Sequence, residues 1–453
     1  MKEKVIIVGA GMAGCFMALC LAKRGFTVEV YEYRPDVRKH PYDSGRSFNL
    51  TLYYRGILAM KKAGLWDKIK DVAILAQGNV AHYLNKKESF NPFDTRGDEV
   101  LYTVHRNKLN GALLNEIEKL PQVSIFFNVR CVGIDREGKN VLFQKTDGKK
   151  ERFSTQADIV VGADGVNSIV RSEMQKGQTA SFTKEHEDWG YKEVHITPEL
   201  AKKLNLRQKA THTWPRDDSL LIAFPNPDDS FTLMFNLPLS GENSFTSLSS
   251  EEAIHTYITN HFPDLAPLLP EITNSFLHKP TGDFTTIRTA PWYHKDFMVL
   301  VGDSAHGVIP FYGQGVCAAF EDCLVLSELI DKNRGGFAKA FAKYQGMRKK
   351  NTDILADLSK ENFFELRDKS RSPFYILKEK TDTFLNRLFP KFWLPPLYIL
   401  VAHTTIDYDD AVRLHKRQQK ISKLIGLDLL LGILAVPVSI LRSPKLFIRQ
   451  SGA

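Results

Sequence analysis

Three glycines near the start of the chain stand at a spacing that suits phosphate binding. Gly9, Gly11 and Gly14 follow an apolar run at 5–8 and open a stretch rich in helix-forming residues. Glycine at these positions permits a tight turn, admits a pyrophosphate to the backbone, and lets helix and strand pack closely. The helix N-terminus offers free N–H groups and partial positive charge. Glu32 ends the next predicted strand, where an acid accepts ribose hydroxyls, so the stretch predicts a dinucleotide site.

Two arginines stand beside this predicted site. Arg34 follows the strand that ends at Glu32, and Arg106 opens a predicted helix after a strand at 99–104. Basic side chains at these places suit contacts with the phosphates of a dinucleotide. The alternatives are a solvated loop for Arg34 and an ordinary helix-surface arginine for Arg106.

Two later turns each place an aspartate after a buried strand. Asp164 follows residues 157–162, and Asp303 follows residues 297–301. Ligands of open α/β sheets bind at the carboxyl ends of the strands. We therefore expect Asp164 to contact a nucleotide sugar or nicotinamide, and Asp303 to contact a polyol chain such as ribityl. For Asp303 the alternative is a helix N-cap.

The turn after Asp303 suits a flat ring. Gly313 and Gly315 let the backbone approach such a ring, and a helix follows whose N-terminus stabilises negative charge developing on a reduced flavin. The residues of this turn that we expect to bind the cofactor are Pro310, Gly313, Gln314 and Gly315.

The elements around these turns predict an α/β fold. Residues 5–32 read as strand, helix and strand, the start of a Rossmann-like domain, to whose sheet the strand at 157–162 returns. The alternating segments 219–225 and 230–236 predict an antiparallel sheet. We expect a discontinuous FAD-binding domain at 1–75, 100–180 and 285–345, an inserted antiparallel-sheet substrate domain at 76–99 and 181–284, a helical C-terminal region at 346–422, and an apolar tail at 423–453.

Composition narrows the class of protein. The chain has 453 residues and five scattered cysteines without metal-ligand spacing. No secretory signal precedes the first strand, so we expect a protein of the reducing cytoplasm. The spacing of the cysteines gives no reason to expect a metal site. Much of the excess in the formal net charge of +9 lies near the C-terminus. Basic residues do not cluster with aromatic ones elsewhere, which argues against nucleic-acid binding.

The C-terminal tail suits a membrane surface. Residues 424–441 are apolar except for Asp428 and Ser439, with lysines and arginines on both sides. The run contains Pro437 and is shorter than the about twenty residues of a comfortable span. We expect it to lie on, or dip into, an anionic membrane. A helix packed on the protein or a dimer contact is the alternative, and the sequence does not determine the oligomeric state.

The three glycine-and-acid turns, in this order, resemble the fingerprints of the FAD-dependent single-component (class A) aromatic hydroxylases. Within that family, segments 45–50, 190–193, 212–215, 310–315 and 321–323 resemble the kynurenine 3-monooxygenase branch. The resemblance implies that NADPH reduces FAD, that O2 is captured as a C4a-hydroperoxide, and that a small aromatic amine such as L-kynurenine is hydroxylated ortho to its amine. It implies no catalytic acid–base side chain, because the protein positions the ring and excludes water. The sequence does not choose NADPH over NADH.

The resemblance also implies a substrate pocket. Asn362 and Glu365 match the family's polar pair, the pocket aromatics are matched by Phe235 and Tyr408, and Phe311 is expected to contact the substrate as well. Where the family holds the amino-acid carboxylate with an arginine and a tyrosine, this chain has Asn79 and Phe93. The lost charge-assisted hydrogen bonds are worth about 1.5–3 kcal/mol each. A different aromatic amine, another cation in the arginine's role, and a flavin reductase or oxidase that does not hydroxylate all stay open.

Overall fold

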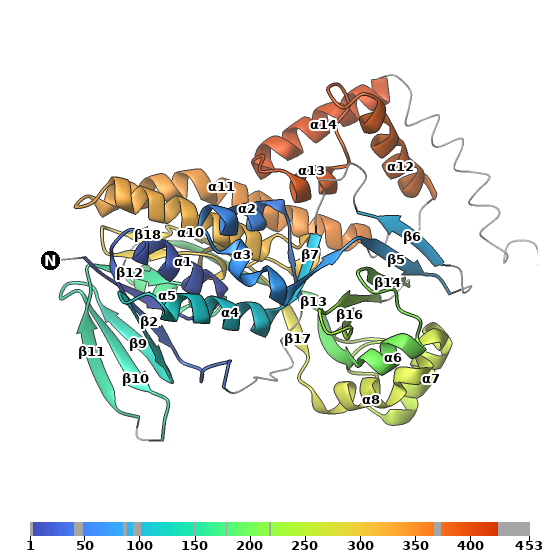
Figure 1. Ribbon diagram of the computed structural model, residues 1–453, viewed down its shortest axis with the longest axis horizontal. Coiled ribbons are helices and arrows are strands. Elements are labelled where there is room, and N and C mark those ends of the chain that lie inside the picture. The colour runs from blue at the N-terminus through green and yellow to red at the C-terminus, as the bar shows by residue number, and fades with distance from the viewer. Residues whose placement is uncertain are drawn as a thin grey trace, which may run out of the picture.

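The computed structural model describes residues 3–39, 49–84, 88–93, 101–148, 150–177, 179–216, 219–366 and 373–424. Figure 1 shows two lobes, each built around a sheet, with the last helices drawn at the upper right, above the second lobe. The first lobe contains a six-stranded sheet of order β18-β19-β12-β1-β2-β8. Its strands are β1 (Lys4–Val8), β2 (Thr27–Glu32), β8 (Val123–Phe127), β12 (Ile159–Gly162), β18 (Tyr293–His294) and β19 (Met298–Leu300). All neighbours pair in parallel except β18, which runs antiparallel to β19.

The first glycine turn joins β1 to α1 (Met12–Ala22) at the centre of this sheet. Gly9 has a φ of +103° and its N–H bonds to the carbonyl of Tyr31 at 2.8 Å. A Cβ at Gly14 would lie 1.9 Å from the carbonyl oxygen of Gly9, so the helix approaches the strand at a distance that only glycine allows. The predicted strand–helix–strand unit is confirmed.

The second lobe contains a seven-stranded sheet of order β17-β13-β16-β15-β14-β5-β6. Its pairs are antiparallel except β14 with β5. As the alternating sequences predict, Leu220–Pro225 and Phe231–Pro238 form neighbouring antiparallel strands, β15 and β16. The other strands are β5 (Gly78–His82), β6 (Glu88–Pro92), β13 (Ser181–Ile196), β14 (Thr211–Pro215) and β17 (Gly282–Ala290).

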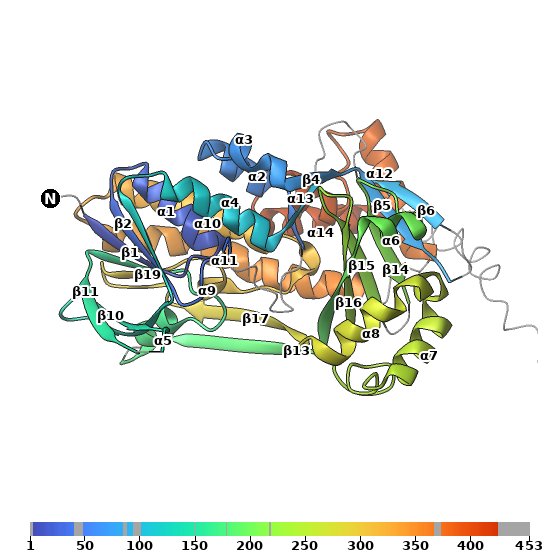
Figure 2. The same ribbon diagram turned by 60° about the horizontal axis from the view of Figure 1, so that its bottom comes forward.

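The two lobes are joined by paired strands. β13 and β17 lie side by side and run from one lobe to the other (Figure 2). Two smaller sheets accompany the six-stranded one: β11-β10-β9 and β3-β7-β4. Their strands are β3 (Asn49–Leu52), β4 (Ala73–Ala76), β7 (Leu101–His105), β9 (Val129–Asp135), β10 (Asn140–Lys145) and β11 (Arg152–Gln156).

Helices cover both lobes and form the C-terminal part. In the first lobe these are α2 (Tyr54–Lys62), α3 (Trp66–Ile69), α4 (Arg106–Glu118), α5 (Ile169–Gln175), α9 (Asp303–His306), α10 (Gly315–Lys332) and α11 (Phe337–Phe364), with short 3-10 turns at Lys70–Val72 and Pro310–Tyr312. The second lobe has α6 (Pro198–Lys203), α7 (Glu251–His261), α8 (Leu269–His278) and a 3-10 turn at Pro263–Leu268. The C-terminal part has α12 (Pro373–Leu388), α13 (Leu397–His403) and α14 (Tyr408–Leu424).

The predicted α/β fold with an antiparallel-sheet part and a helical C-terminal region is confirmed, whereas the exact domain boundaries stay a prediction. Among the described residues, no helix is both long enough and apolar enough to cross a bilayer. The predicted tail, from 425 onward, and segment 45–48 lie outside the described residues.

The glycine turn gives a test of the fold. We expect Gly14→Ala to lower the free energy of unfolding by about 1–3 kcal/mol, because the new methyl group overpacks against the Gly9 carbonyl. Gly11→Ala is the matched control, since a Cβ there meets nothing within 4 Å and the φ of −70° suits alanine. Urea denaturation of both variants checks this. Equal stability of the two would contradict the proposed close approach.

Candidate active site

One large cavity lies between the two principal sheets. Its volume is about 2480 Å³, more than twice the roughly 1,000 Å³ at the upper end of ordinary ligand pockets. Its walls include Gly9 and Gly11 of the first turn, Thr211 and Thr213 of β14, and Asn362 at the end of α11. The volume therefore suits a dinucleotide together with a second, smaller molecule.

The first-turn end of the cavity has the donors and acceptors that a dinucleotide requires. The Oε2 atom of Glu32 accepts from the Ala10 N–H at 2.9 Å, and its Oε1 atom accepts from the backbone and Nε of Arg34 at 3.1 and 3.0 Å. The Oε2 atom keeps a further lone pair for a ribose hydroxyl. Gly11 faces open space and Arg34 and Arg106 also line the cavity. These residues fit FAD.

The two predicted aspartates have different environments. Asp164 accepts hydrogen bonds from the N–H groups of Ile169 and Val170 at 2.7 and 3.2 Å, at the start of α5. Burial raises the pKa of Asp164. Although Asp164 lines the cavity, its carboxylate is largely engaged by this helix end. Asp303 is exposed, lines the cavity, and begins α9.

The turn at 310–315 brings backbone against the cavity. Gly313 has a φ of +66°, and a Cβ there would lie 2.4 Å from the Thr51 Oγ1 atom. Pro310, Gly313 and Gly315 line the cavity, and Gly315 begins α10. Gln314 does not line it. Its Oε1 atom instead accepts from the hydroxyl of Tyr408 at 3.5 Å, so this side chain ties the turn to the C-terminal helices.

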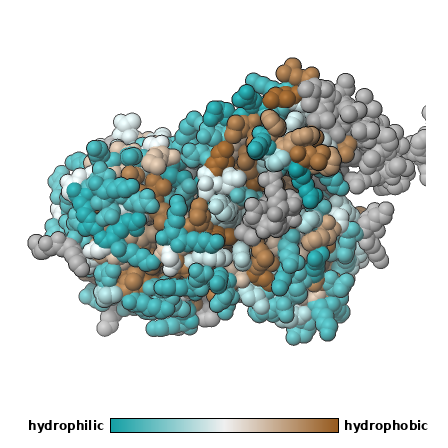
Figure 3. Space-filling view, turned by 45° about the horizontal axis from the view of Figure 1, so that its top comes forward, coloured by the Kyte–Doolittle hydropathy of each residue, from teal (hydrophilic) through white to brown (hydrophobic). Residues whose placement is uncertain are grey.

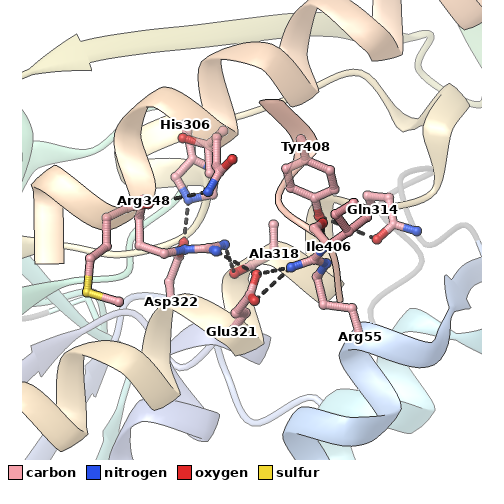
Figure 4. Close-up of polar contacts among 12 residues, drawn as sticks. Arg55, His306, Gln314, Ala318, Glu321, Asp322, Arg348, Ile406 and Tyr408 are labelled. Carbon is pink, nitrogen blue, oxygen red and sulfur yellow. Dashed lines mark hydrogen bonds and ion pairs between the residues drawn. The ribbon is translucent and has the colours of Figure 1, made fainter. Parts of the chain in front are cut away.

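A buried ionic network, defined by Arg55, Glu321, Asp322, Arg348 and His306, lies behind this turn (Figure 4). Arg55 of α2 donates to both oxygens of Glu321 at 2.7 and 2.8 Å. Arg348 of α11 pairs with Glu321 at 2.6 Å and with Asp322 at 2.7 Å. His306 contacts the other oxygen of Asp322. The network therefore joins α2, α9 and α11 to the first turns of α10.

The charges of this network set the ionisation of Asp322. Burial alone would raise the pKa of this carboxyl group, but His306 and Arg348 outweigh burial and lower it. A carboxylate with a lowered pKa stabilises the fold above the pKa that it has in the unfolded chain, and that stabilisation is lost as the pH falls through its folded-state pKa.

Four predicted substrate residues lie around the cavity: Asn79, Phe93, Phe311 and Asn362. The Nδ2 atom of Asn362 donates to the carbonyl of Phe311 at 2.7 Å, which fixes the two residues together. The Asn79 amide donates to Thr213 and accepts from Thr211, both at 3.0 Å. These four residues therefore bring neutral polar groups and aromatic rings to this end of the cavity.

Three other predicted substrate residues are not brought to the cavity wall. Phe235 packs against Phe262 and Phe276 in the core under α7 and α8, while its neighbour Met234 lines the cavity. Adjacent strand residues face opposite sides of a sheet, so the assignment of Phe235 is corrected to Met234. Tyr408 is fully buried behind Gln314, with Arg55 4.5 Å above its ring. Glu365 is not among the residues lining the cavity.

Several lining residues were missed by sequence reasoning. Tyr53 and Tyr398 both line the cavity, and their hydroxyl groups form a hydrogen bond with each other. Glu379 and Lys380 of α12 line it as well. The sequence offers two tyrosines in this region, Tyr398 and Tyr408, and only their side-chain directions in the fold distinguish which one reaches the cavity.

The buried network leads to a stability prediction. We expect Arg348→Met to lower the free energy of unfolding by about 3–5 kcal/mol, because it leaves the fully buried Asp322 and the partly buried Glu321 with too little positive charge. Lys349→Met is the control: it removes the next cation along the helix, whose half-buried pair with Asp353 is worth about 0–1 kcal/mol. Urea denaturation measures both. A loss of similar size in the two variants would count against the network.

Comparison with known proteins agrees with this architecture. The model of the family described as "FAD binding domain" matches residues 2–341. Among solved structures, 2-methyl-3-hydroxypyridine-5-carboxylic acid oxygenase is similar with a TM-score of 0.67 and 21% identity, over 82% of this chain and 94% of that one. The tetracycline destructase Tet(51) has a TM-score of 0.60 and 17% identity, over 86% and 96% of the two chains. These two likenesses concern the fold alone.

Similarity in sequence is closer to another group of enzymes. The chain is 39% identical to kynurenine 3-monooxygenase of Salinispora arenicola, over 97% of both chains. It is 35% identical to the protein of that name from Legionella pneumophila, over 92% of both chains. On these similarities and the family match, the chain belongs to the kynurenine 3-monooxygenase family of FAD-binding proteins.

Proposed function

We propose that this chain is a FAD-dependent monooxygenase that uses NADPH and O2 to hydroxylate kynurenine on the ring carbon beside its amine. The observation that carries the proposal is the continuous cavity, which joins the glycine turn at Gly9 to the wall at Asn362. The names of the relatives support the choice of substrate, and the similarity extends over nearly the whole chain.

The residues at the cofactor end of the cavity serve to bind and orient FAD. FAD, when bound, supplies the redox chemistry by taking two electrons from NADPH and activating O2. Glu32 would accept a ribose hydroxyl, and the N-terminus of α1 would bind the pyrophosphate. The N-terminus of α10 at Gly315 would supply partial positive charge to the ring, which favours negative charge on its reduced form.

The residues of the substrate end hold the aromatic ring and exclude water. Phe224, Met234 and Phe311 give the cavity an apolar wall. The Nδ2 atom of Asn362 is used by Phe311, so the Oδ1 atom is the one placed to accept from an aromatic amine. Hydroxylation of an electron-rich ring requires that the ring be oriented and that water be excluded, more than it requires acid–base catalysis. The apolar wall serves both requirements.

A second candidate substrate class is favoured by one observation. The amide of Asn79 is held by Thr211 and Thr213, and Phe93 has no polar atom, so neither offers charge to a carboxylate. An aromatic amine that lacks the amino-acid carboxylate would suit these two positions equally well. It would undergo the same reaction in the same cavity.

The proposed reaction is tested with the purified protein. We expect bound FAD, oxidation of NADPH that kynurenine accelerates, and a product heavier by one oxygen atom in mass spectrometry. With 18O2 that atom should carry the label. Oxidation of NADPH that yields hydrogen peroxide in full, with no hydroxylated product from any aromatic amine, would instead identify an oxidase.

We also propose, from the sequence, that the tail beyond Leu424 contacts an anionic membrane while the rest of the protein lies in the cytoplasm. Apolar surface gathers on the C-terminal helices that precede this tail (Figure 3). Phe392 and Leu424 are 87% and 85% exposed, and Phe384, Leu388 and Phe389 are exposed as well. Lysines and arginines flank the apolar run at 424–441 on both sides, and such charges favour anionic lipid.

Deletion of residues 425–453 tests this proposal. The full chain should sediment with vesicles that contain phosphatidylserine, and the shortened chain should stay in the supernatant with its FAD retained. Vesicles of neutral lipid are the control, because they lack the charge that attracts the basic flanks. Equal sedimentation of the two chains would reject the tail as the contact.

A further inference from the structure

The cavity wall holds two adjacent residues of opposite charge, and both lie on α12. Glu379 and Lys380 line the same cavity as Asn362 and Tyr398. Figures 1 and 2 both place α12 beside β5 and β6, the strands at the substrate end. An acid and a base in adjacent positions there match the two charges of an α-amino acid.

The other cations on the described part of the wall have different partners or places. Arg216 donates through Nε to the carbonyl of His261 at 2.6 Å and through Nη1 to the carbonyls of His82 and Pro215 at 3.1 and 3.0 Å. Arg34 bonds to Glu32 at the dinucleotide end, and Arg130 lies 5.2 Å from the ring of Tyr33 beside it. Arg106 begins α4, against the glycine turn.

We propose that Lys380 binds the α-carboxylate of the substrate and that Glu379 binds its α-ammonium, so that α12 selects an amino-acid head group. The proposal rests on the proposed function and assigns to α12 the charges that Asn79 and Phe93 do not supply. Lys380 is exposed at the cavity rim, where its ammonium group reaches an incoming anion without first losing its water.

The surroundings of Glu379 suit an incoming cation. Burial, and after it the nearby charges of Asp382 and Glu365, raise the pKa of this carboxyl group to about 7, while Lys378 opposes them. From α14, His415 faces the same group of charges, and burial lowers the pKa of its imidazole. A substrate ammonium binds the ionised form of Glu379, so the KM should fall as the pH rises through about 7.

The test compares three substrates in the intact holoenzyme. They are kynurenine, kynuramine (which lacks the carboxylate) and the desamino analogue (which lacks the α-ammonium). Lys380→Gln should raise the KM about two- to fivefold for kynurenine and the desamino analogue and leave kynuramine unchanged. Glu379→Gln should raise the KM for kynurenine and kynuramine and flatten its dependence on pH. Lys391→Gln, which removes an exposed lysine outside the cavity wall, is the control.

Retained FAD and an unchanged melting temperature show that each variant folds. If the wild-type protein hydroxylates kynurenine but neither variant changes its KM, or if each variant weakens all three substrates equally, the assignment of α12 is overturned and the proposed function stands. If the wild-type protein binds FAD but hydroxylates none of the three substrates, the proposed function fails, and the assignment of α12 fails with it.

Discussion

The position of the cavity wall at Gly313–Gly315 depends on ion pairs between α10 and the helices packed against it. Glu321 and Asp322 are adjacent carboxylates on that helix, and removing an ionised carboxylate from water costs several kcal/mol. Arg55 and Arg348 offset this cost with close, partly bidentate pairs. Since separating these charges from their partners costs free energy, the ion pairs fix the helices that carry them relative to one another. The pairs of Glu321 and Asp322 therefore fix the position of the N-terminus of α10.

The same network reaches the C-terminal helices. A second nitrogen of Arg55 donates to the carbonyl of Ile406 at 2.6 Å, and its guanidinium lies 4.5 Å from the ring centre of Tyr408. Tyr408 in turn bonds to Gln314 in the turn before α10. One arginine thus couples the cofactor end of the cavity to the loop at Ile406 and to the start of α14. A movement of α14 away from the cavity would break contacts to a buried charge.

The sequence predicts the cofactor end well because that end is made of backbone. Gly9, Gly14 and Gly313 are required by close approaches and positive φ angles, and such requirements appear directly as glycine. The parallel strands around the glycine turn are short apolar runs, which the hydrophobic pattern also shows. The order of the strands and the long pair β13 and β17 that joins the two lobes depend on pairing between distant segments, which local pattern does not show.

The substrate end is harder to predict because it depends on where side chains point. Phe235 and Met234 differ by one position on β16, and Tyr408 and Tyr398 stand on neighbouring helices, yet in each pair only one residue reaches the cavity. Asp164 has the expected place but gives its carboxylate to the start of α5. The face that a strand turns to the core and the hydrogen bonds formed in the fold decide these cases, and the local sequence does not encode them.

The two ends of the cavity therefore recognise their ligands by different means. At the cofactor end, backbone N–H groups and a helix N-terminus recognise phosphate, which every FAD molecule carries. A substitution at this end therefore affects binding of the cofactor whatever the substrate. At the other end, the neutral cluster of Asn79, Thr211 and Thr213 satisfies its own hydrogen bonds and leaves no formal charge for an amino acid. We assign the charge for the substrate to an element outside the sheets. α12 is such an element, and a change there alters the choice of substrate without disturbing the strands that hold the cofactor.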